Sequence, residues 1–185
     1  VMHSQSNFTF CLNEAFQIVQ LPLNGRFFSY LPLCHVAERC LVEMGAIYAH
    51  GEIHFAESLD KFAFNLQEAS PHVFLGVPRI WTKFQLAILD KISPKRLSLL
   101  LKIPLLSSYL KQKVKKALGF TETVYYLSGA APIASSLLKW YKTLGIEILE
   151  AYGMTENLCY SHFNRHGQIK MGTVGQALPK NEVRI

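Results

Sequence analysis

The stretch EAYGMTE (residues 150–156) directly follows residues 146–149, which are apolar except for Glu147. Short apolar runs are typical of buried strands, so the polar groups lie at the carboxyl end of an expected strand. In open α/β sheets, ligands bind at that end of the strands. Tyr152 offers a flat face for a base, Thr155 a hydroxyl for a phosphate oxygen, and Glu156 a hard carboxylate for Mg²⁺. The alternative is a strand-to-loop turn that Thr155 and Glu156 merely cap.

Strand-like and helical segments alternate along the chain before this stretch. Strands are expected at residues 26–31, 51–55, 73–77, 123–127 and 147–151. Helices are expected at residues 8–19, 36–48, 59–69, 78–92 and 134–143, with one or two more before residue 119. A hairpin of residues 159–163 and 168–170 is expected to follow, with its turn at 164–167. This order predicts an α/β fold, an open and mostly parallel sheet with helices on both faces and a small β hairpin region near the C-terminus.

Four residues with ligand-binding chemistry or backbone freedom lie at or just after the carboxyl end of an expected strand. They are His35, Gly76, Gly129 and Tyr152. The carboxyl ends of parallel strands meet at one edge of a sheet, so we expect these residues to gather along one crevice.

Four further motifs accompany the opening stretch. They are LPLCHVAER at 31–39, VPRIW at 77–81, SGAAP at 128–132 and GTVGQALP at 172–179. Together with YGMTE at 152–156, they resemble, in the same order, motifs of the AMP-forming acyl-CoA synthetase (adenylate-forming) superfamily. The stretch at 77–81 is most similar to the long-chain fatty acid–CoA ligases.

The resemblance implies a role for each motif. A nucleotide would contact residues of the two loops after the last parallel strands: Gly129, Ala130, Ala131, Glu150, Ala151, Tyr152, Gly153, Met154 and Thr155. Tyr152 would stack on the adenine. Thr155 and Glu156 would be the catalytic pair, with Thr155 on a phosphate oxygen and Glu156 on the metal. The acyl substrate would be bordered by His35, Gly172, Val174 and Gly175.

The implied reaction has two halves and uses ATP, Mg²⁺ and coenzyme A. A fatty acid carboxylate attacks the α-phosphorus of ATP and displaces pyrophosphate, and the thiolate of coenzyme A then attacks the acyl-AMP. The first half needs in-line positioning and neutralisation of the phosphate charge.

The resemblance covers only part of such an enzyme. The sequence contains no Ser/Thr/Gly-rich phosphate loop ending in Pro-Lys-Gly, and the family's ribose-binding Asp would come after residue 185. We therefore expect an internal piece of an N-terminal domain, with residues 1–157 as a partial nucleotide- and acyl-binding α/β domain and 158–185 as the truncated start of a β-rich region. Such a piece is expected to turn over little or no substrate, because losing one preorganised charge contact costs about 3 kcal/mol of activation free energy.

Two other functions stay open. One is a fatty acyl-AMP ligase that loads a carrier protein instead of coenzyme A. The other is a truncated, non-catalytic nucleotide- or lipid-binding module. A dehydrogenase is disfavoured, because no Gly-x-Gly-x-x-Gly follows an expected strand.

The formal net charge of +6 is concentrated in residues 91–116, where leucines alternate with lysines. Such a basic amphipathic segment could lie on an anionic membrane surface, or attract the phosphates of ATP or coenzyme A. It could equally be a solvated helix face whose leucines pack inward. Binding of nucleic acid is disfavoured, because Tyr109 is almost the only aromatic residue available for stacking.

Composition indicates a folded, cytoplasmic protein. No stretch approaches the roughly 20 apolar residues of a membrane-spanning helix, and the first residues do not resemble a signal peptide. The 4 cysteines lack disulfide or metal spacing, so we interpret them as reduced thiols. Uncovered sheet edges in a partial domain would favour self-association.

Several single residues have two interpretations. From position alone His35 could cap the helix that follows it or fill a core position, whereas the resemblance favours a place at the substrate. Trp81 and Phe84 could be helix core or the wall of an acyl tunnel. The other histidines lack the company of ligands at zinc spacing, so we expect no zinc site.

Overall fold

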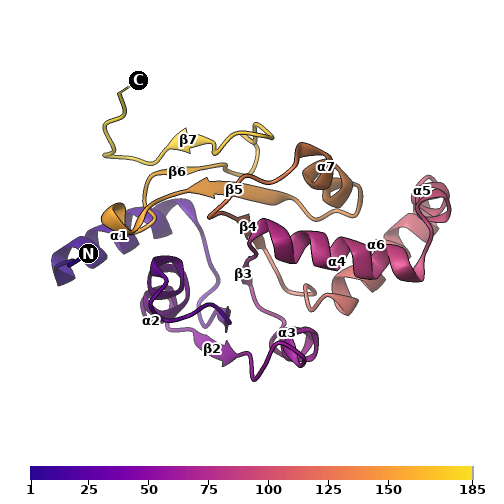
Figure 1. The fold of residues 1–185 in the computed structure, drawn as a ribbon, viewed down its shortest axis with the longest axis horizontal. Helices are drawn as coiled ribbons and strands as arrows, with labels where there is room; N and C mark the ends of the chain where they lie inside the picture. The colour runs from indigo at the N-terminus through magenta and orange to yellow at the C-terminus, as the bar shows by residue number, and fades with distance from the viewer. Residues whose placement is uncertain (185) are drawn as a thin grey trace.

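Seven strands form one sheet in the order β2-β1-β3-β4-β5-β6-β7 in the computed structural model, which describes residues 1–184 (Figure 1). The strands are β1 (Arg26–Ser29), β2 (Glu52–Phe55), β3 (Val73–Leu75), β4 (Tyr125–Ser128), β5 (Ile148–Tyr152), β6 (His162–Phe163) and β7 (Gln176–Ala177). The first five pair in parallel, and β6 and β7 add to β5 in antiparallel fashion. The open, mostly parallel sheet predicted from the sequence is confirmed.

Helices cover both faces of the sheet, as predicted. They are α1 (Gln5–Ile18), η1 (Glu38–Met44), α2 (Gly45–Tyr48), α3 (Phe62–Ala69), α4 (Pro78–Lys91), α5 (Pro94–Leu101), α6 (Pro104–Ala117), α7 (Ser135–Thr143) and the short η2 (Thr155–Asn157). In Figure 1, α1 and α2 lie on one side of the sheet, and α4, α6 and α7 lie on the other. Among residues 1–184, no helix combines the length and the hydropathy needed to cross a bilayer.

Local sequence explains where these helices begin. The Ser4 hydroxyl accepts a hydrogen bond from the Asn7 N–H at 3.3 Å and so caps α1. Pro78, Pro94 and Pro104 each occupy the first turn of their helix, where a missing N–H costs no hydrogen bond.

The larger core lies between the sheet and the α3–α7 side and is rich in aromatic residues. Trp81 is fully buried, and its ring N–H donates to the carbonyls of Gly76 at 2.9 Å and Leu127 at 3.2 Å. Phe84 packs in the same cluster. Of the two interpretations of Trp81 and Phe84, helix core is therefore the correct one.

The helix expected at residues 36–48 is present, but its middle part is a π-helix. Residues 38–44, η1, form the π-helix, and residues 36–37 and α2 on either side of it are α-helical. The wider turns bury Glu38 and Val42 toward the sheet, while Cys40 and Leu41 line the cavity described below. Hydrophobic periodicity does not distinguish i+5 from i+4 hydrogen bonding over so short a segment.

The C-terminal hairpin has a different second strand from the one predicted. β6 pairs with β7 at Gln176–Ala177, whereas residues 168–170 form part of the connecting loop. The reason is the buried side chain of Asn164, which accepts a hydrogen bond from the Lys170 N–H at 3.0 Å and donates to the Thr173 carbonyl at 2.5 Å. Because the loop folds around this amide, the strand that pairs with β6 begins later in the sequence, at Gln176.

Candidate functional site

Two loops meet at the carboxyl ends of β4 and β5, as the sequence predicted. The two strands are parallel neighbours, with Ser128 paired to Glu150. A Cβ added to Gly129 would lie 3.3 Å from the Ala151 carbonyl oxygen. The backbone of the 128–132 turn therefore runs directly beside the 150–156 stretch.

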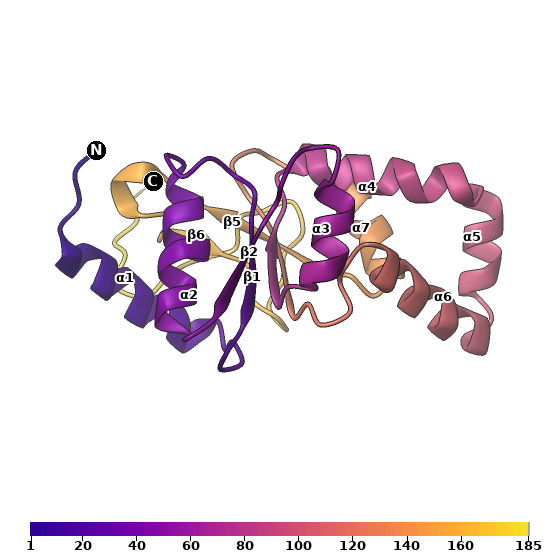
Figure 2. The same cartoon turned by 90° about the horizontal axis from the view of Figure 1, so that it is seen from below.

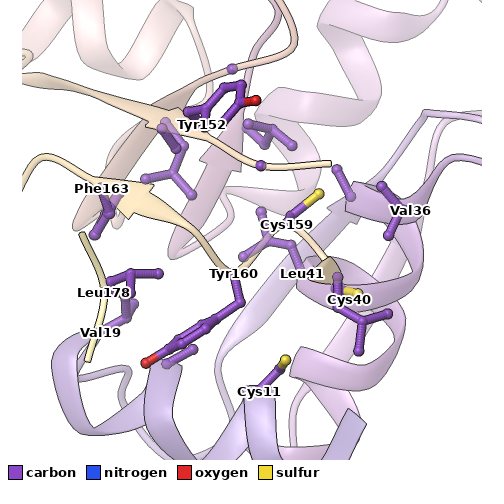
Figure 3. A pocket seen from close by; sticks show the side chains of 18 of the residues that line it. Cys11, Val19, Val36, Cys40, Leu41, Tyr152, Cys159, Tyr160, Phe163 and Leu178 are labelled. Carbon is purple, nitrogen blue, oxygen red and sulfur yellow. The ribbon is translucent and has the colours of Figure 1, made fainter. Parts of the chain in front are cut away.

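A cavity of about 340 Å³ opens beside these loops (Figure 3). Most of its wall is apolar and comes from α1, η1 and the strand ends. It is also lined by eight of the residues predicted from the sequence: His35, Gly129, Ala130, Ala151, Tyr152, Gly153, Met154 and Thr155. Gly76 lies between two lining residues but is itself packed against Trp81, where an added Cβ would be 2.7 Å from the ring nitrogen.

The remaining predicted residues do not line this cavity. They are Ala131, Glu150, Glu156, Gly172, Val174 and Gly175. Successive residues of a strand face opposite sides of the sheet. Ala151 faces the cavity side with Leu149, so Glu150 faces the α7 side with Ile148.

Glu150 connects β5 to the glycine loop that follows β6. Its carboxylate accepts a hydrogen bond from the Gly172 N–H at 2.9 Å. Burial raises the pKa of Glu150, and the Gly172 hydrogen bond opposes that rise. The structure therefore places Gly172 at Glu150, on the face of β5 opposite the cavity, and the 172–175 run does not line the cavity with His35. Opposite Glu150, the hydroxyl of Ser128 is buried and has no hydrogen-bond partner within residues 1–184.

His35 both caps a turn and lines the cavity, so its two interpretations are compatible. Its Nδ1 accepts a hydrogen bond from the Ala37 N–H at 3.2 Å. A neutral imidazole that accepts at Nδ1 carries its proton on Nε2. His35 can then present a hydrogen-bond donor to a ligand.

The 152–156 stretch is exposed at the cavity mouth. Tyr152 is 44% exposed, and its ring centroid lies 6.1 Å from that of His162. Thr155 and Glu156 begin η2, which is held by a 2.9 Å hydrogen bond from the Met154 N–H to the Asn157 side chain. The arrangement leaves an aromatic face, a hydroxyl and a carboxylate accessible together.

The sequence did not identify His3 as part of this region. Its ring Nε2 lies 2.7 Å from the Thr155 carbonyl oxygen, across 152 residues of sequence. The first residues of the chain therefore lie beside Thr155 of the 150–156 stretch. Nothing in the local pattern around His3 indicates this contact.

Backbone strain gathers around the cavity. Three lining residues that are not glycine have left-handed backbone, with φ of 67° at Ala130, 54° at Leu158 and 59° at Cys159. Such conformations cost about 1–3 kcal/mol each and cluster at ligand sites. Gly153 allows this loop to close, because an added Cβ would lie 2.3 Å from the Cys159 Cα.

Three free cysteines from separate elements line the cavity, as Figure 3 shows. Burial raises the pKa of Cys40 to about 12 and that of Cys159 to about 11, and it also raises the pKa of Cys11. These thiols are therefore protonated at neutral pH and are poor nucleophiles. Sequence spacing could not reveal the cluster, because residues 11, 40 and 159 come from α1, η1 and the loop after η2.

Glu156, the metal ligand implied by the sequence, belongs to no cluster of potential metal ligands among residues 1–184. Within residues 1–184, no three His, Cys, Asp or Glu side chains are grouped so that they could hold a metal ion. A single exposed carboxylate nevertheless suits Mg²⁺, which usually keeps several waters and binds one or two carboxylates together with substrate phosphates. Glu156 fits that requirement.

Comparison with known proteins agrees with this geometry. The sequence profile described as AMP-binding enzyme matches residues 1–185. A putative fatty-acid–CoA ligase of Mycobacterium tuberculosis is 27% identical over 202 residues, covering 91% of this chain and 35% of that protein. A long-chain-fatty-acid–CoA ligase of Xenopus laevis is 29% identical over 189 residues, covering 85% of this chain and 26% of that protein. The chain thus spans about a third or less of these relatives.

Solved structures share the fold. The N-terminal domain of FACL13 from Mycobacterium tuberculosis superposes with a TM-score of 0.70 at 18% identity, covering 97% of this chain and 40% of that one. A benzoate CoA ligase from Burkholderia xenovorans also gives 0.70, at 20% identity, covering 96% of this chain and 32% of that one. The match over all 185 residues, on a sheet with two motif loops side by side, shows that the chain belongs to the family of AMP-binding enzymes.

Proposed function

We propose that this chain is part of an ATP-dependent acyl-activating enzyme, a long-chain fatty acid–CoA ligase that forms acyl-AMP and then acyl-CoA. One observation carries the proposal: the 128–132 and 150–156 loops lie side by side and share an apolar cavity. The named relatives are fatty-acid–CoA ligases, which supports the same assignment.

The two loops would bind the nucleotide. The backbone at Gly129 and Ala130 would face the adenine, and Tyr152 would stack on it with its exposed ring. Thr155 would donate a hydrogen bond to a phosphate oxygen. Glu156 would hold Mg²⁺, which supplies positive charge next to the phosphates when bound.

The apolar cavity would take the acyl chain. Its wall from α1 and η1 is largely apolar, and removal of the chain from water would drive binding. His35 would donate from Nε2 to an oxygen of the acyl carboxylate. The carboxylate oxygen would then attack the α-phosphorus, with pyrophosphate leaving in line.

Several narrower proposals accompany this function. Residues 1–157 would form the partial nucleotide- and acyl-binding unit, and residues 158–185 the start of a β-rich region. The chain alone would bind ligands with little turnover, because its sequence contains no phosphate loop ending in Pro-Lys-Gly. We place the enzyme in the cytoplasm, with membrane contact through residues 91–116. Self-association through the exposed edge strand β2, where Phe55 is 66% exposed, would appear as a dimer in light scattering.

Isothermal titration of the chain tests the main proposal. The ligands are ATP, a free long-chain fatty acid, and non-hydrolysable acyl-adenylate analogues of increasing chain length. We expect the analogues to bind most tightly, with affinity rising about fourfold for each buried methylene. The proposal would be contradicted if the analogues did not bind, or if their affinity did not change with the length of the acyl chain. ATP–pyrophosphate exchange by a longer gene product, followed by transfer to coenzyme A or to a carrier protein, identifies the acceptor.

A further inference from the structure

The positive charge of the chain is segregated into one helical region. We define the basic arm as residues 91–116, which comprise the end of α4, α5 and most of α6. The arm contains eight of the 19 lysines and arginines and none of the 13 acidic residues, so 11 basic and 13 acidic residues remain elsewhere. The arm is strongly positive, whereas the rest of the chain is weakly negative.

The cations of the arm lack carboxylate partners. Across residues 1–184, the six ion pairs of the structure involve lysine, arginine and histidine residues outside the arm. Two arm cations lie near aromatic rings instead: the Lys113 ammonium is 6.0 Å from the ring centroid of Tyr109, and the Lys115 ammonium is 5.9 Å from that of Tyr126. The arm therefore presents positive charge that the fold does not neutralise.

Large apolar side chains stand among these cations. Leu105 is 86% exposed, and Leu99 and Tyr109 are each 63% exposed, with Ile103 and Leu106 also open to solvent. On α5, Lys95, Leu99 and Lys102 share one face and line a shallow groove. On α6, Leu106, Tyr109 and Lys113 share a face at the same helical spacing.

The inner side of the arm anchors it to the domain. Leu97 and Val114 are buried and belong to the aromatic core described above. Figure 2 shows α4, α5 and α6 extending beyond the sheet, with α5 at the end of the molecule farthest from the N-terminus. The exposed leucines are thus additional to the residues that the fold needs for its core.

We propose that the tip of the basic arm docks on the surface of an anionic lipid bilayer. The lysines contact headgroup phosphates, and the side chains of Leu99, Leu105 and Tyr109 enter the interface. Helices that carry cations together with exposed apolar side chains are typical of segments that lie on membranes. A protein partner fits less well, because the cores of protein–protein interfaces are depleted in lysine.

The docking is separate from the proposed catalysis. The nucleotide loops and the cavity involve no residue of the arm. Lipid binding should therefore occur without ATP or acyl substrate, and arm variants should still bind the acyl-adenylate analogue. Failure of one proposal is then distinguishable from failure of the other.

Vesicle flotation tests the docking, because bound protein rises while aggregated protein sinks. The probes are phosphatidylcholine vesicles with and without about 30 mol% phosphatidylserine, at about 0.1 M and 1 M salt. The wild-type chain should float with the anionic vesicles at low salt, and should remain at the bottom with neutral vesicles or at high salt.

Two variants and one control make the test specific. The triple variant Lys95→Gln, Lys102→Gln, Lys113→Gln should bind about a hundredfold more weakly, at roughly fivefold per lysine. The double variant Leu99→Ser, Leu105→Ser should also lose binding, since burial of each leucine contributes about tenfold or more. The matched control changes the same charge elsewhere, at Lys61, Lys139 and Lys170, and should float like the wild type.

Three results would overturn the proposal: no flotation of the wild type, equal flotation of the triple variant and its control, or equal binding to neutral vesicles. Light scattering tests whether a second copy of this chain binds the arm instead of a membrane. A wild-type dimer that becomes monomeric in the Leu99→Ser, Leu105→Ser variant, without lipid binding, would assign the arm to self-association and reject docking on membranes.

Discussion

The Glu150 carboxylate accepts a 2.9 Å hydrogen bond from the Gly172 N–H, 22 residues along the chain. This contact joins the last parallel strand to the glycine loop and lies on the face of β5 opposite the cavity. Glu150 is therefore a positioning residue for the loop. The 150–156 stretch lines the cavity on one face of β5 and is attached to the glycine loop on the other.

Replacing Glu150 tests the anchor. Glu150→Ala removes the acceptor of the Gly172 N–H from a partly buried hydrogen bond, so the free energy of unfolding should fall by about 1–2 kcal/mol. Glu150→Gln keeps an acceptor oxygen and removes a charge that burial disfavours, so its loss should be below about 1 kcal/mol. Urea unfolding at pH 7 measures both. Equal losses in the two variants would mean that the hydrogen bond does not hold the loop.

Tyr152 is the residue on which the proposed stacking of adenine depends. Tyr152→Ala should weaken binding of the acyl-adenylate analogue by about 1–3 kcal/mol, the range measured for base–aromatic stacking. Tyr152→Phe keeps the ring and should bind within about threefold of the wild type. Calorimetric titration makes the comparison. A large loss in Tyr152→Phe would point to the hydroxyl instead of the ring face.

The thiols of the cavity should be slow to react, in contrast to the exposed Cys34. With the pKa of Cys159 raised to about 11, only about one thiolate in a thousand exists at pH 8. Alkylation followed by mass spectrometry should therefore label Cys34 first, and Cys34→Ser should abolish the fast phase. The acyl-adenylate analogue should slow labelling of Cys11, Cys40 and Cys159 further and leave Cys34 unchanged. Rapid labelling of Cys40 in the folded chain would contradict this assignment.

Much of the fold follows from local sequence signals. The parallel strands are marked by apolar runs, and Pro78 marks a helix start that was predicted. Because parallel strands end at one edge, the meeting of Gly129 with Ala151 also followed from element order. Signals confined to a few neighbouring residues were sufficient for these features.

The features that the sequence did not predict depend on contacts between distant residues. The return strand β7 is displaced by hydrogen bonds to the buried Asn164 side chain. The cavity wall combines α1 with η1, so Cys11 and Cys40 become neighbours only after the helices pack. The separation of Gly172 from His35 depends on which face of β5 carries Glu150, and a one-residue change of register would reverse it.

The buried carboxylate of Glu38 should make stability depend on pH. Its side chain is 1% exposed, Oε2 accepts a 3.3 Å hydrogen bond from the Leu31 N–H, and Oε1 has no partner within residues 1–184. Burial raises the pKa of Glu38 above its ordinary value. The folded state then holds this proton more tightly than the unfolded state, so stability is full below the unfolded pKa of about 4.3 and falls as pH rises through the folded pKa.

Glu38→Gln removes this titration. The variant should match the wild type near pH 4 and exceed its unfolding free energy by on the order of 1 kcal/mol near pH 8. Glu68→Gln, at an exposed position, controls for the loss of one negative charge. Denaturant unfolding across this pH range gives the comparison. A constant difference between Glu38→Gln and the wild type would show that Glu38 does not titrate within the range.

Gly153 tests whether close packing of the motif loop matters for binding. In Gly153→Ala the new methyl would meet backbone atoms of Cys159, with Cα at 2.3 Å and the carbonyl oxygen at 2.6 Å. Backbone cannot rotate away as a side chain can, and Cys159 already has a left-handed φ of 59°. The loop must therefore shift, and we expect about 1–3 kcal/mol of lost stability together with weaker binding of the acyl-adenylate analogue.

Gly45→Ala is the matched control for that change. Gly45 lies in helical backbone, with φ of −61°, and its added Cβ would meet its nearest neighbour at an ordinary 3.4 Å. Alanine favours helix over glycine by about 1 kcal/mol, so this variant should be as stable as the wild type or more stable, with binding unchanged. Thermal unfolding and calorimetry on both variants separate the two effects. Unchanged binding in Gly153→Ala would mean that the loop can relax away from Cys159 without disturbing the nucleotide site, and the strain around the cavity would then have no role in recognition.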